Sequence, residues 1–141
     1  MLRIISGTAK NIRLEVPPSA RPMMDRPKSA IFSILQNNIP NAEVLDLFAG
    51  SGAMGLECLS RGAKSCKFVE ITSDGVNCIK ENILKCRIDD SKTQIIKGDA
   101  LKFLLKILHK SYRNQKKKVE QLSSNSKEYE SPKLESEETY D

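Results

Sequence analysis

The chain has 141 residues, of which 39% are apolar and 29% charged, a composition typical of a single globular domain. Its first residues contain no long apolar run of the kind that a signal peptide or membrane span requires, so we expect a cytoplasmic protein that makes no membrane contact. Four cysteines without a Cys-x-x-Cys pair and a single histidine cannot assemble the usual zinc frameworks. We therefore expect no metal site and four free thiols.

The formal net charge of +5 is unevenly distributed along the chain. Residues 1–42 hold six Lys or Arg against two acids, residues 43–109 hold ten against nine, and residues 110–141 hold seven against seven. A basic patch of this kind is the footprint expected of a contact with nucleic acid. Surplus cations on a solvated face are the simpler alternative, and charge alone leaves both interpretations open.

The N-terminal part combines two short strand-like runs with one helix. Residues 2–6 and 11–16 are rich in Ile, Leu, Val and Arg and flank a turn, which predicts a β-hairpin. Asp25 is placed to be the N-cap of a following helix, with Pro27 in its first turn. Apolar residues then recur at helical spacing as far as Leu35.

Strand and helix patterns alternate after this helix, which implies an α/β fold with a parallel, doubly wound sheet. The predicted strands are 43–48, 65–70 and 93–97, and the predicted helices are 51–61, 73–86 and 100–109.

The composition from Ser111 to Glu138 is almost free of large apolar residues, which predicts a flexible insertion or tail. We therefore expect three parts: the hairpin and helix at 1–42, a ligand-binding half-domain at 43–109, and the polar segment at 110–141.

The stretch VLDLFAGSGAMGLE at 44–57 predicts a strand, a glycine turn and a helix. Gly50, Gly52 and Gly55 satisfy the pattern GxGxxG, which is weak evidence by itself. Asp46, at the end of the strand, would repel a dinucleotide pyrophosphate but attract a cationic ligand. S-adenosylmethionine has an ammonium and a sulfonium and no phosphate, so it suits such a site. An aspartate that only serves the turn is the alternative.

Ligands in doubly wound sheets bind outside the carboxyl ends of the strands, where Phe48, Glu70 and Asp99 are expected. Glu70 can accept hydrogen bonds from both ribose hydroxyls of an adenosine ligand, unless it is only a solvent-facing acid. Asp99 can accept one from an adenine amino group, although it is also placed as N-cap of the helix that begins at Ala100. We expect the three strand ends, with Asp46, to share one crevice.

Several segments together resemble the bacterial 16S ribosomal RNA guanine-N2 methyltransferases, over roughly residues 2–105. The resemblance implies a Rossmann-like fold that binds S-adenosylmethionine. It also implies methyl transfer to the exocyclic N2 of a guanine in small-subunit ribosomal RNA, as naked RNA or in an assembled subunit. The segments are RIISG at 3–7, RPMMDRPKSAIFSIL at 21–35, VLDLFAGSGAMGLECLSRGA at 44–63, FVE at 68–70 and GDA at 98–100.

The same resemblance implies roles for individual residues. The methionine end of the cofactor would lie at Asp46, Gly50 and Gly52, beside Phe48. Its ribose would lie at Glu70 and its adenine at Asp99 and Ala100. The N-terminal segments would face the RNA, and their candidate contacts are Arg3, Lys10, Arg13, Arg21 and Arg26.

The family's Asp or Asn, Pro, Pro, aromatic motif, which holds the target guanine, has no counterpart before the final residues Thr139 to Asp141. Those residues are expected to start the strand that leads to it. We therefore assign no catalytic residue and expect an incomplete sheet and an inactive isolated chain, whose second half belongs to a longer protein or a partner. A binding module that holds cofactor or RNA without turnover is the main alternative. A nicotinamide-dependent oxidoreductase is a third, against which Asp46 counts.

Overall fold

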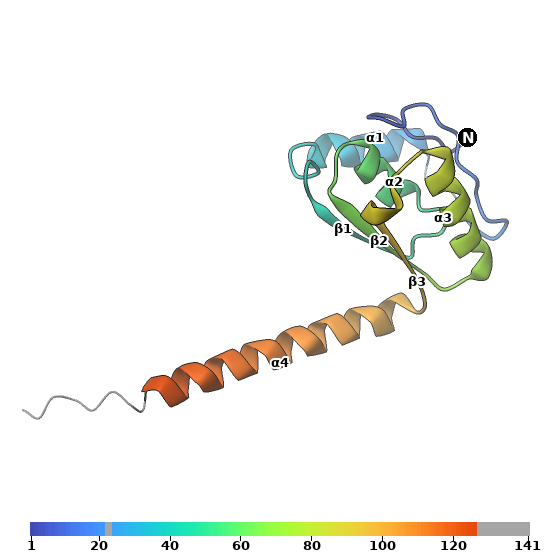
Figure 1. Ribbon diagram of the computed structural model, residues 1–141. Helices are drawn as coiled ribbons and strands as arrows, with labels where there is room; N and C mark the ends of the chain where they lie inside the picture. The colour runs from blue at the N-terminus through green and yellow to red at the C-terminus, as the bar shows by residue number, and fades with distance from the viewer. Residues whose placement is uncertain (22–23, 127–141) are drawn as a thin grey trace, which may run out of the picture. The chain divides into compact units, whose positions relative to one another are not determined.

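The computed structural model describes residues 1–21 and 24–126 (Figure 1). The chain divides into two compact units, one of residues 1–104 and one that begins at Leu105. The elements are α1 (Asp25–Leu35), β1 (Glu43–Leu47), α2 (Ala53–Ser60), β2 (Ser65–Glu70), α3 (Ser73–Lys85), the short 3-10 helix η1 (Asp90–Lys92), β3 (Thr93–Lys97) and α4 (Ala100–Ser126).

The three strands form a parallel sheet in the order β1-β2-β3, with α2 and α3 as the crossover helices. The register pairs Asp46 with Phe68 and Glu70 with Lys97, so the carboxyl ends of the strands meet at one edge. The predicted α/β class with a parallel sheet is confirmed. In the described part of the chain, β1 is an edge strand of this sheet.

The core of the first unit lies on the sheet face that carries Cys66 and Phe68, both at most 1% exposed. Side chains of α1, α2 and α3 and of the N-terminal segment join the same apolar cluster, whose members include Phe32, Leu56 and Ile79. One face of the sheet is thus covered by three helices and by residues that precede all of them. Among the described residues, no helix is both long and apolar enough to cross a bilayer.

Helix α3 follows directly from its sequence. The Thr72 hydroxyl caps it by accepting the Gly75 N–H at 3.0 Å, which satisfies one of the unpaired donors of the first turn. Val76, Ile79 and Ile83, spaced by three and four residues, form its buried apolar stripe. The helix is therefore fixed by a local cap and by an apolar face at the 3.6-residue period.

The predicted N-terminal hairpin is reduced to a single antiparallel bridge between Arg3 and Arg13. Backbone hydrogen bonds join Ile4 to Ile12 at 3.0 Å and Leu2 to Leu14 at 3.0 Å, but no regular strand forms. The reason is that this segment packs its apolar residues onto the helices, while the N–H groups of Ile5, Ser6 and Ala9 donate to side chains of α2.

The expected N-cap of α1 is wrong. The helix begins at Asp25 and its N-cap is Met24, so Asp25 is the first helical residue and binds Arg3 Nε at 3.2 Å instead of capping. The recurring apolar residues also do not mark its buried face. Lys28 and Phe32 are the buried residues of α1, while Ile34 is 79% exposed.

Helix α4 continues to Ser126, far beyond the predicted end at residue 109. The expected flexible segment is therefore helical from residue 111 to residue 126. Low apolar content argues against burial, but Lys, Gln, Glu and Leu are good helix formers, and no Gly or Pro interrupts residues 100–126. The rest of the expected tail, and the strand start expected at 139–141, lie outside the described residues.

Candidate functional site

Two cavities open at the carboxyl ends of the strands, where one crevice was expected. The smaller, of about 50 Å³, is lined by Phe48, Glu70, Asp99 and Ala100 among others. The larger, of about 270 Å³, is lined by residues from β1, the glycine turn and the N-terminal segment. Its lining residues are Leu2, Val16, Ala20, Arg21, Asp46, Leu47, Phe48, Ala49, Gly50, Ser51, Ala53 and Met54.

Phe48 lines both cavities, so a ligand that spans them must pass it. Its φ of 56° lies in the left-handed region, which is uncommon for a bulky residue, and its side chain is 72% exposed. Backbone strain with an exposed aromatic ring is typical of binding sites, where neighbouring structure holds the strained conformation.

The glycine turn needs glycine for two reasons. Gly50 and Gly52 have φ values of 56° and 78°, a region open to glycine at little cost. Gly55 instead allows α2 to approach the sheet, because a Cβ there would lie 2.4 Å from Phe68 Cε1 and 2.6 Å from Cys66 Sγ. Gly52 is buried as the N-cap of α2 and, unlike Gly50, lines neither cavity.

Asp46 is a partly buried carboxylate at the end of β1. Its Oδ2 accepts the Gly55 N–H at 3.0 Å. Burial raises the pKa of Asp46 to about 6, and nearby Glu70 adds to the rise, while the Gly55 N–H opposes it. Among the described residues, no Lys or Arg pairs with this carboxylate. At neutral pH the site therefore presents a largely ionised carboxylate that favours a cation.

Glu70 is only 8% exposed, so it is not the solvent-facing acid of the alternative reading. Its Oε2 accepts the Thr72 hydroxyl at 2.8 Å and the Thr72 N–H at 3.3 Å. Its Oε1 accepts the Gly50 N–H at 3.3 Å, which links the end of β2 to the glycine turn. A Cβ on Gly75 would lie 2.5 Å from Oε2. The carboxylate is therefore held in place, with capacity left to accept further hydrogen bonds.

Asp99 has the N-cap role considered for it, and it lies at the cavity edge where the adenine contact was expected. Its Oδ1 accepts the Lys102 N–H at 2.9 Å, which caps α4, and its side chain also lines the smaller cavity. Ala100, the first residue of α4, is 5% exposed beside it.

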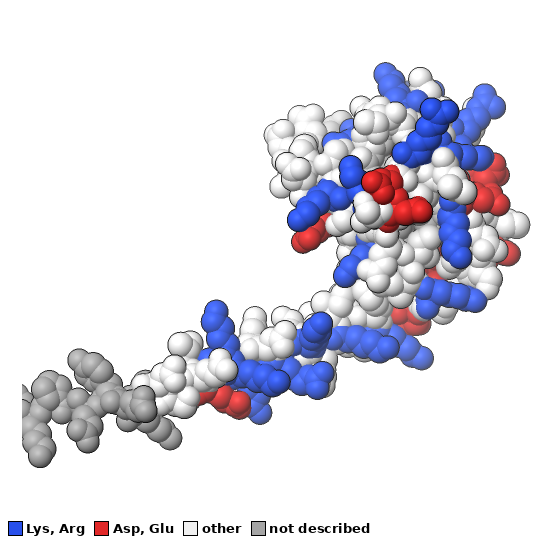
Figure 2. Space-filling model, viewed as in Figure 1, with Lys and Arg blue, Asp and Glu red and all other residues white. Residues whose placement is uncertain are grey.

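The candidate RNA contacts differ in their surroundings. Lys10, Arg13 and Arg26 are exposed, whereas Arg3 is paired with Asp25. Lys28, which contributes to the basic excess of residues 1–42, is fully buried and neutralised by an acid. On the face shown in Figure 2, Lys and Arg side chains of the first unit are interspersed with Asp and Glu. The basic character therefore belongs to particular exposed residues of the N-terminal segment.

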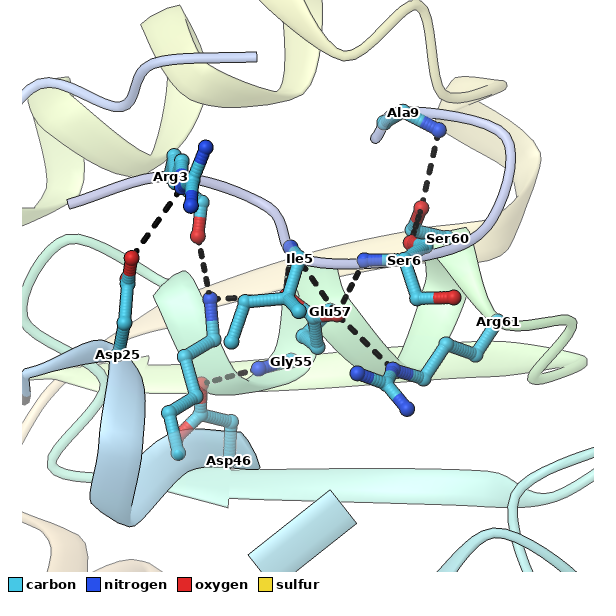
Figure 3. A network of polar contacts seen from close by, with 11 residues as sticks. Arg3, Ile5, Ser6, Ala9, Asp25, Asp46, Gly55, Glu57, Ser60 and Arg61 are labelled. Atoms are coloured by element: carbon cyan, nitrogen blue, oxygen red, sulfur yellow. Dashed lines mark hydrogen bonds and ion pairs between the residues drawn. The ribbon is translucent and has the colours of Figure 1, made fainter. Parts of the chain in front are cut away.

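A buried ion-pair network on α2 was not anticipated from the sequence (Figure 3). Glu57 is 0% exposed and accepts hydrogen bonds from Lys28 Nζ at 2.8 Å and Arg61 Nε at 2.9 Å. It also accepts the N–H groups of Ile5 at 2.9 Å and Ser6 at 3.0 Å. Burial alone would raise the pKa of Glu57, but the donors from Lys28, Ile5 and Arg61 outweigh it and hold that pKa below its usual value.

The next turn of α2 holds the same segment a second time. The Ser60 hydroxyl donates to the Ser6 carbonyl at 2.6 Å and accepts the Ala9 N–H at 2.9 Å. Gly7, with a φ of 88°, allows this approach because a Cβ there would lie 1.8 Å from the Ser60 carbonyl oxygen. Glu57 and Ser60 together clamp the N-terminal segment onto α2. In the sequence, the only local signal for this clamp is Glu57 itself, an acid among apolar residues of a short helix, four residues before Arg61.

Asn82 of α3 is a second unanticipated anchor and is fully buried. Its side chain accepts the Glu15 N–H at 2.8 Å and donates to the Glu15 carbonyl at 2.9 Å. It also donates to the Ser51 carbonyl at 2.9 Å. One side chain therefore ties the end of the N-terminal segment to the glycine turn.

The four cysteines are free, as expected, with Cys66 and Cys86 buried. Burial raises the pKa of Cys58 and of Cys86 to about 11, so both remain protonated thiols at neutral pH. Within the described residues, no three His, Cys, Asp or Glu side chains are grouped so that they could hold a metal ion.

A parallel sheet with a glycine turn after its first strand and acids at its strand ends defines a Rossmann-like α/β fold. The C-terminal domain of precorrin-6Y C5,15-methyltransferase from Rhodobacter capsulatus shares this fold at 18% identity, with a TM-score of 0.54 over 66% of this chain and 50% of that one. The predicted Rossmann-like fold is thereby confirmed.

Residues 2–129 match the family described as conserved hypothetical protein 95, and the chain belongs to this family. It is 37% identical over 105 residues to the ribosomal RNA small subunit methyltransferase D of Haemophilus influenzae, covering 73% of this chain and 54% of the relative. A hypothetical protein of Thermus thermophilus superimposes with a TM-score of 0.69 at 33% identity, covering 79% of this chain and 63% of that one. The family expected from the sequence is confirmed. The chain spans about half the length of the curated relatives it matches.

Proposed function

We propose that this chain provides the cofactor-binding half of a methyltransferase that modifies the exocyclic N2 of a guanine in small-subunit ribosomal RNA, and that it acts in the cytoplasm. The observation that carries the proposal is a pair of acids, the partly buried Asp46 and the buried Glu70, placed at adjoining strand ends beside two cavities that both include Phe48 in their lining. The name of the Haemophilus influenzae relative supports the reaction class and the RNA.

The residues fit S-adenosylmethionine on charge and shape. Asp46 is a carboxylate that no described basic side chain neutralises, and it would hold the ammonium at the methionine end, beside Gly50, while Gly52 would shape the turn from beneath. Glu70 would accept the ribose hydroxyls, and Asp99 with Ala100 would flank the adenine. Two cavities that share Phe48 as a lining residue suit a ligand with two chemically distinct ends.

When bound, S-adenosylmethionine supplies a methyl group on a positively charged sulfur that an amine can attack in line. The chain's own contribution is to orient that group. Phe48 lies where the cavities meet, so its ring can contact the sulfonium through a cation–π interaction. Asp46 and Glu70 would hold the two ends of the ligand on either side. Orientation of this kind is a major part of catalysis for a transfer between two bound substrates.

The RNA is proposed to approach from the N-terminal segment, where Arg3, Lys10, Arg13 and Arg26 present cations on or near the surface. The clamp formed by Glu57 and Ser60 fixes this segment on α2, the helix that follows the glycine turn. RNA and cofactor would therefore be held by parts of one compact unit.

A titration calorimetry experiment with S-adenosylhomocysteine tests the cofactor site without requiring turnover. Binding by the wild-type chain is expected, with at least tenfold weaker binding by Asp46→Ala and by Glu70→Ala, because a lost hydrogen bond to a charged group costs about 1.5 to 3 kcal/mol. NAD serves as the control ligand and should not bind. Unchanged affinity in both variants would remove the basis of the proposal.

A binding module without turnover remains the second candidate, because the chain spans about half the length of its curated relatives and no catalytic residue is assigned in it. A methyl-transfer assay on unmodified small subunits can exclude this second candidate. We expect the 141-residue chain alone to transfer no methyl group. Transfer by the purified chain would exclude the binding-module reading.

A further inference from the structure

The larger cavity has two charged lining residues among those that the structure describes, and they carry opposite charges. Asp46 lines it from β1 and Arg21 from the end of the N-terminal segment. The remaining lining consists of apolar side chains and the small residues of the glycine turn, and the volume is about 270 Å³. A cavity with one acid, one base and otherwise apolar walls matches an α-amino acid with an apolar side chain.

Arg21 is free to bind a ligand. Its side chain is exposed, and it forms no ion pair with another described residue. The Ala20 N–H donates to the Pro17 carbonyl at 3.0 Å, so a turn directly precedes Arg21, which lines the same cavity as Asp46 of β1. A guanidinium presents several N–H donors in a planar fork that binds a carboxylate through two parallel hydrogen bonds.

The two walls of the cavity are connected. Asn82 holds both backbone groups of Glu15 and the carbonyl of Ser51. Ser51 lines the cavity from the glycine turn, and Val16, the residue after Glu15, lines it from the N-terminal segment. The segment that leads to Arg21 is therefore anchored to the turn beside Asp46 by a fully buried side chain. Such an anchor keeps the positions of the two charges matched to one ligand.

We propose that Arg21 binds the carboxylate of the cofactor's amino-acid end while Asp46 binds its ammonium, so that Arg21 is a cofactor-specificity residue and not an RNA contact. The inference rests on the proposed function, since it assigns one end of the same cofactor. Apolar residues such as Val16 and Met54 then face the methylene groups between the amino acid and the sulfur.

The test compares two ligands that differ only at this end. S-adenosylhomocysteine carries the amino acid, whereas 5′-methylthioadenosine keeps the adenosine and the thioether without it. Arg21→Gln should weaken S-adenosylhomocysteine binding about tenfold or more and leave methylthioadenosine binding unchanged. Arg21→Lys should recover part of the loss because it restores the charge. Lys64→Gln, an exposed substitution that lies in neither cavity, is the matched control and should change neither affinity.

Three results of these titrations would contradict the assignment of Arg21. Equal affinity of wild type and Arg21→Gln for S-adenosylhomocysteine would overturn the inference while leaving the proposed function intact, and a loss of RNA binding instead would return Arg21 to the RNA contacts. Equal weakening of both ligands would place the effect outside the amino-acid end and also overturn it. Failure of the wild-type chain to bind either ligand would refute the proposed function itself, and the inference with it.

Discussion

Replacing Asp46 with asparagine should stabilise the free protein and weaken its cofactor binding. Burial raises the pKa of this carboxyl from 3.8 to about 6, so the folded state holds the proton more tightly than the unfolded chain. Ionised Asp46 therefore lowers stability, and this cost grows as the pH rises from about 4 to about 6 and is constant above that. The amide oxygen of asparagine can still accept the Gly55 N–H, so the substitution removes the charge with little change of shape.

The size of the effect follows from the shift. A rise from 3.8 to about 6 at roughly 1.4 kcal/mol for each pKa unit corresponds to at most about 3 kcal/mol. We expect Asp46→Asn to raise the free energy of unfolding by about 1 to 3 kcal/mol at pH 7.5. The gain should shrink below pH 6 and vanish near pH 4, where the wild-type carboxyl is also protonated in the folded state.

Urea unfolding of wild type and Asp46→Asn at pH 7.5, 5.5 and 4 measures this difference directly. Titration with S-adenosylhomocysteine at pH 7.5 should show at least tenfold weaker binding by the variant, because the ammonium loses its counter-charge. A variant less stable than wild type at pH 7.5 would refute the reasoning, since Asp46 would then make a stabilising interaction in the free protein.

Three further outcomes follow from the same structure. Lys28→Met removes a buried partner of Glu57 and should lower the free energy of unfolding by about 3 kcal/mol. A loss below 1 kcal/mol in urea unfolding would show that the other donors suffice. Gly55→Ala should cost about 1 to 3 kcal/mol through the contact at 2.4 Å with Phe68, seen as a lower melting temperature. Wild-type affinity for S-adenosylhomocysteine should fall as the pH drops through about 6, where Asp46 gains a proton, and a flat calorimetric profile from pH 7.5 to 5 would contradict this.

The sequence determined much of the fold because its signals are local. Alternation of strand and helix patterns placed β1, β2, β3 and α3 within a residue of their observed bounds. The glycine turn was visible because positive φ values demand glycine. The acids Asp46, Glu70 and Asp99 could be assigned to one edge of the sheet because parallel strands bring their carboxyl ends together.

The sequence was least informative about features that depend on contacts between segments far apart in the chain. The apolar spacing of α1 predicted a helix, but which face is buried depends on the N-terminal segment, and Lys28 rather than Ile34 is inside. Helix α4 extends further than its low apolar content predicts, because helix propensity does not require burial.

Tertiary structure alone decided how the site is assembled. The bonds from Ile5 to Glu57 and from Glu15 to Asn82 join residues 52 and 67 positions apart, and no local pattern encodes such pairs. Arg21 looked like any other cation of a basic segment until the fold placed it beside the cavity of Asp46. Periodicity and turn chemistry specify elements one at a time, whereas the partner of a buried charge is set only when separate elements pack together.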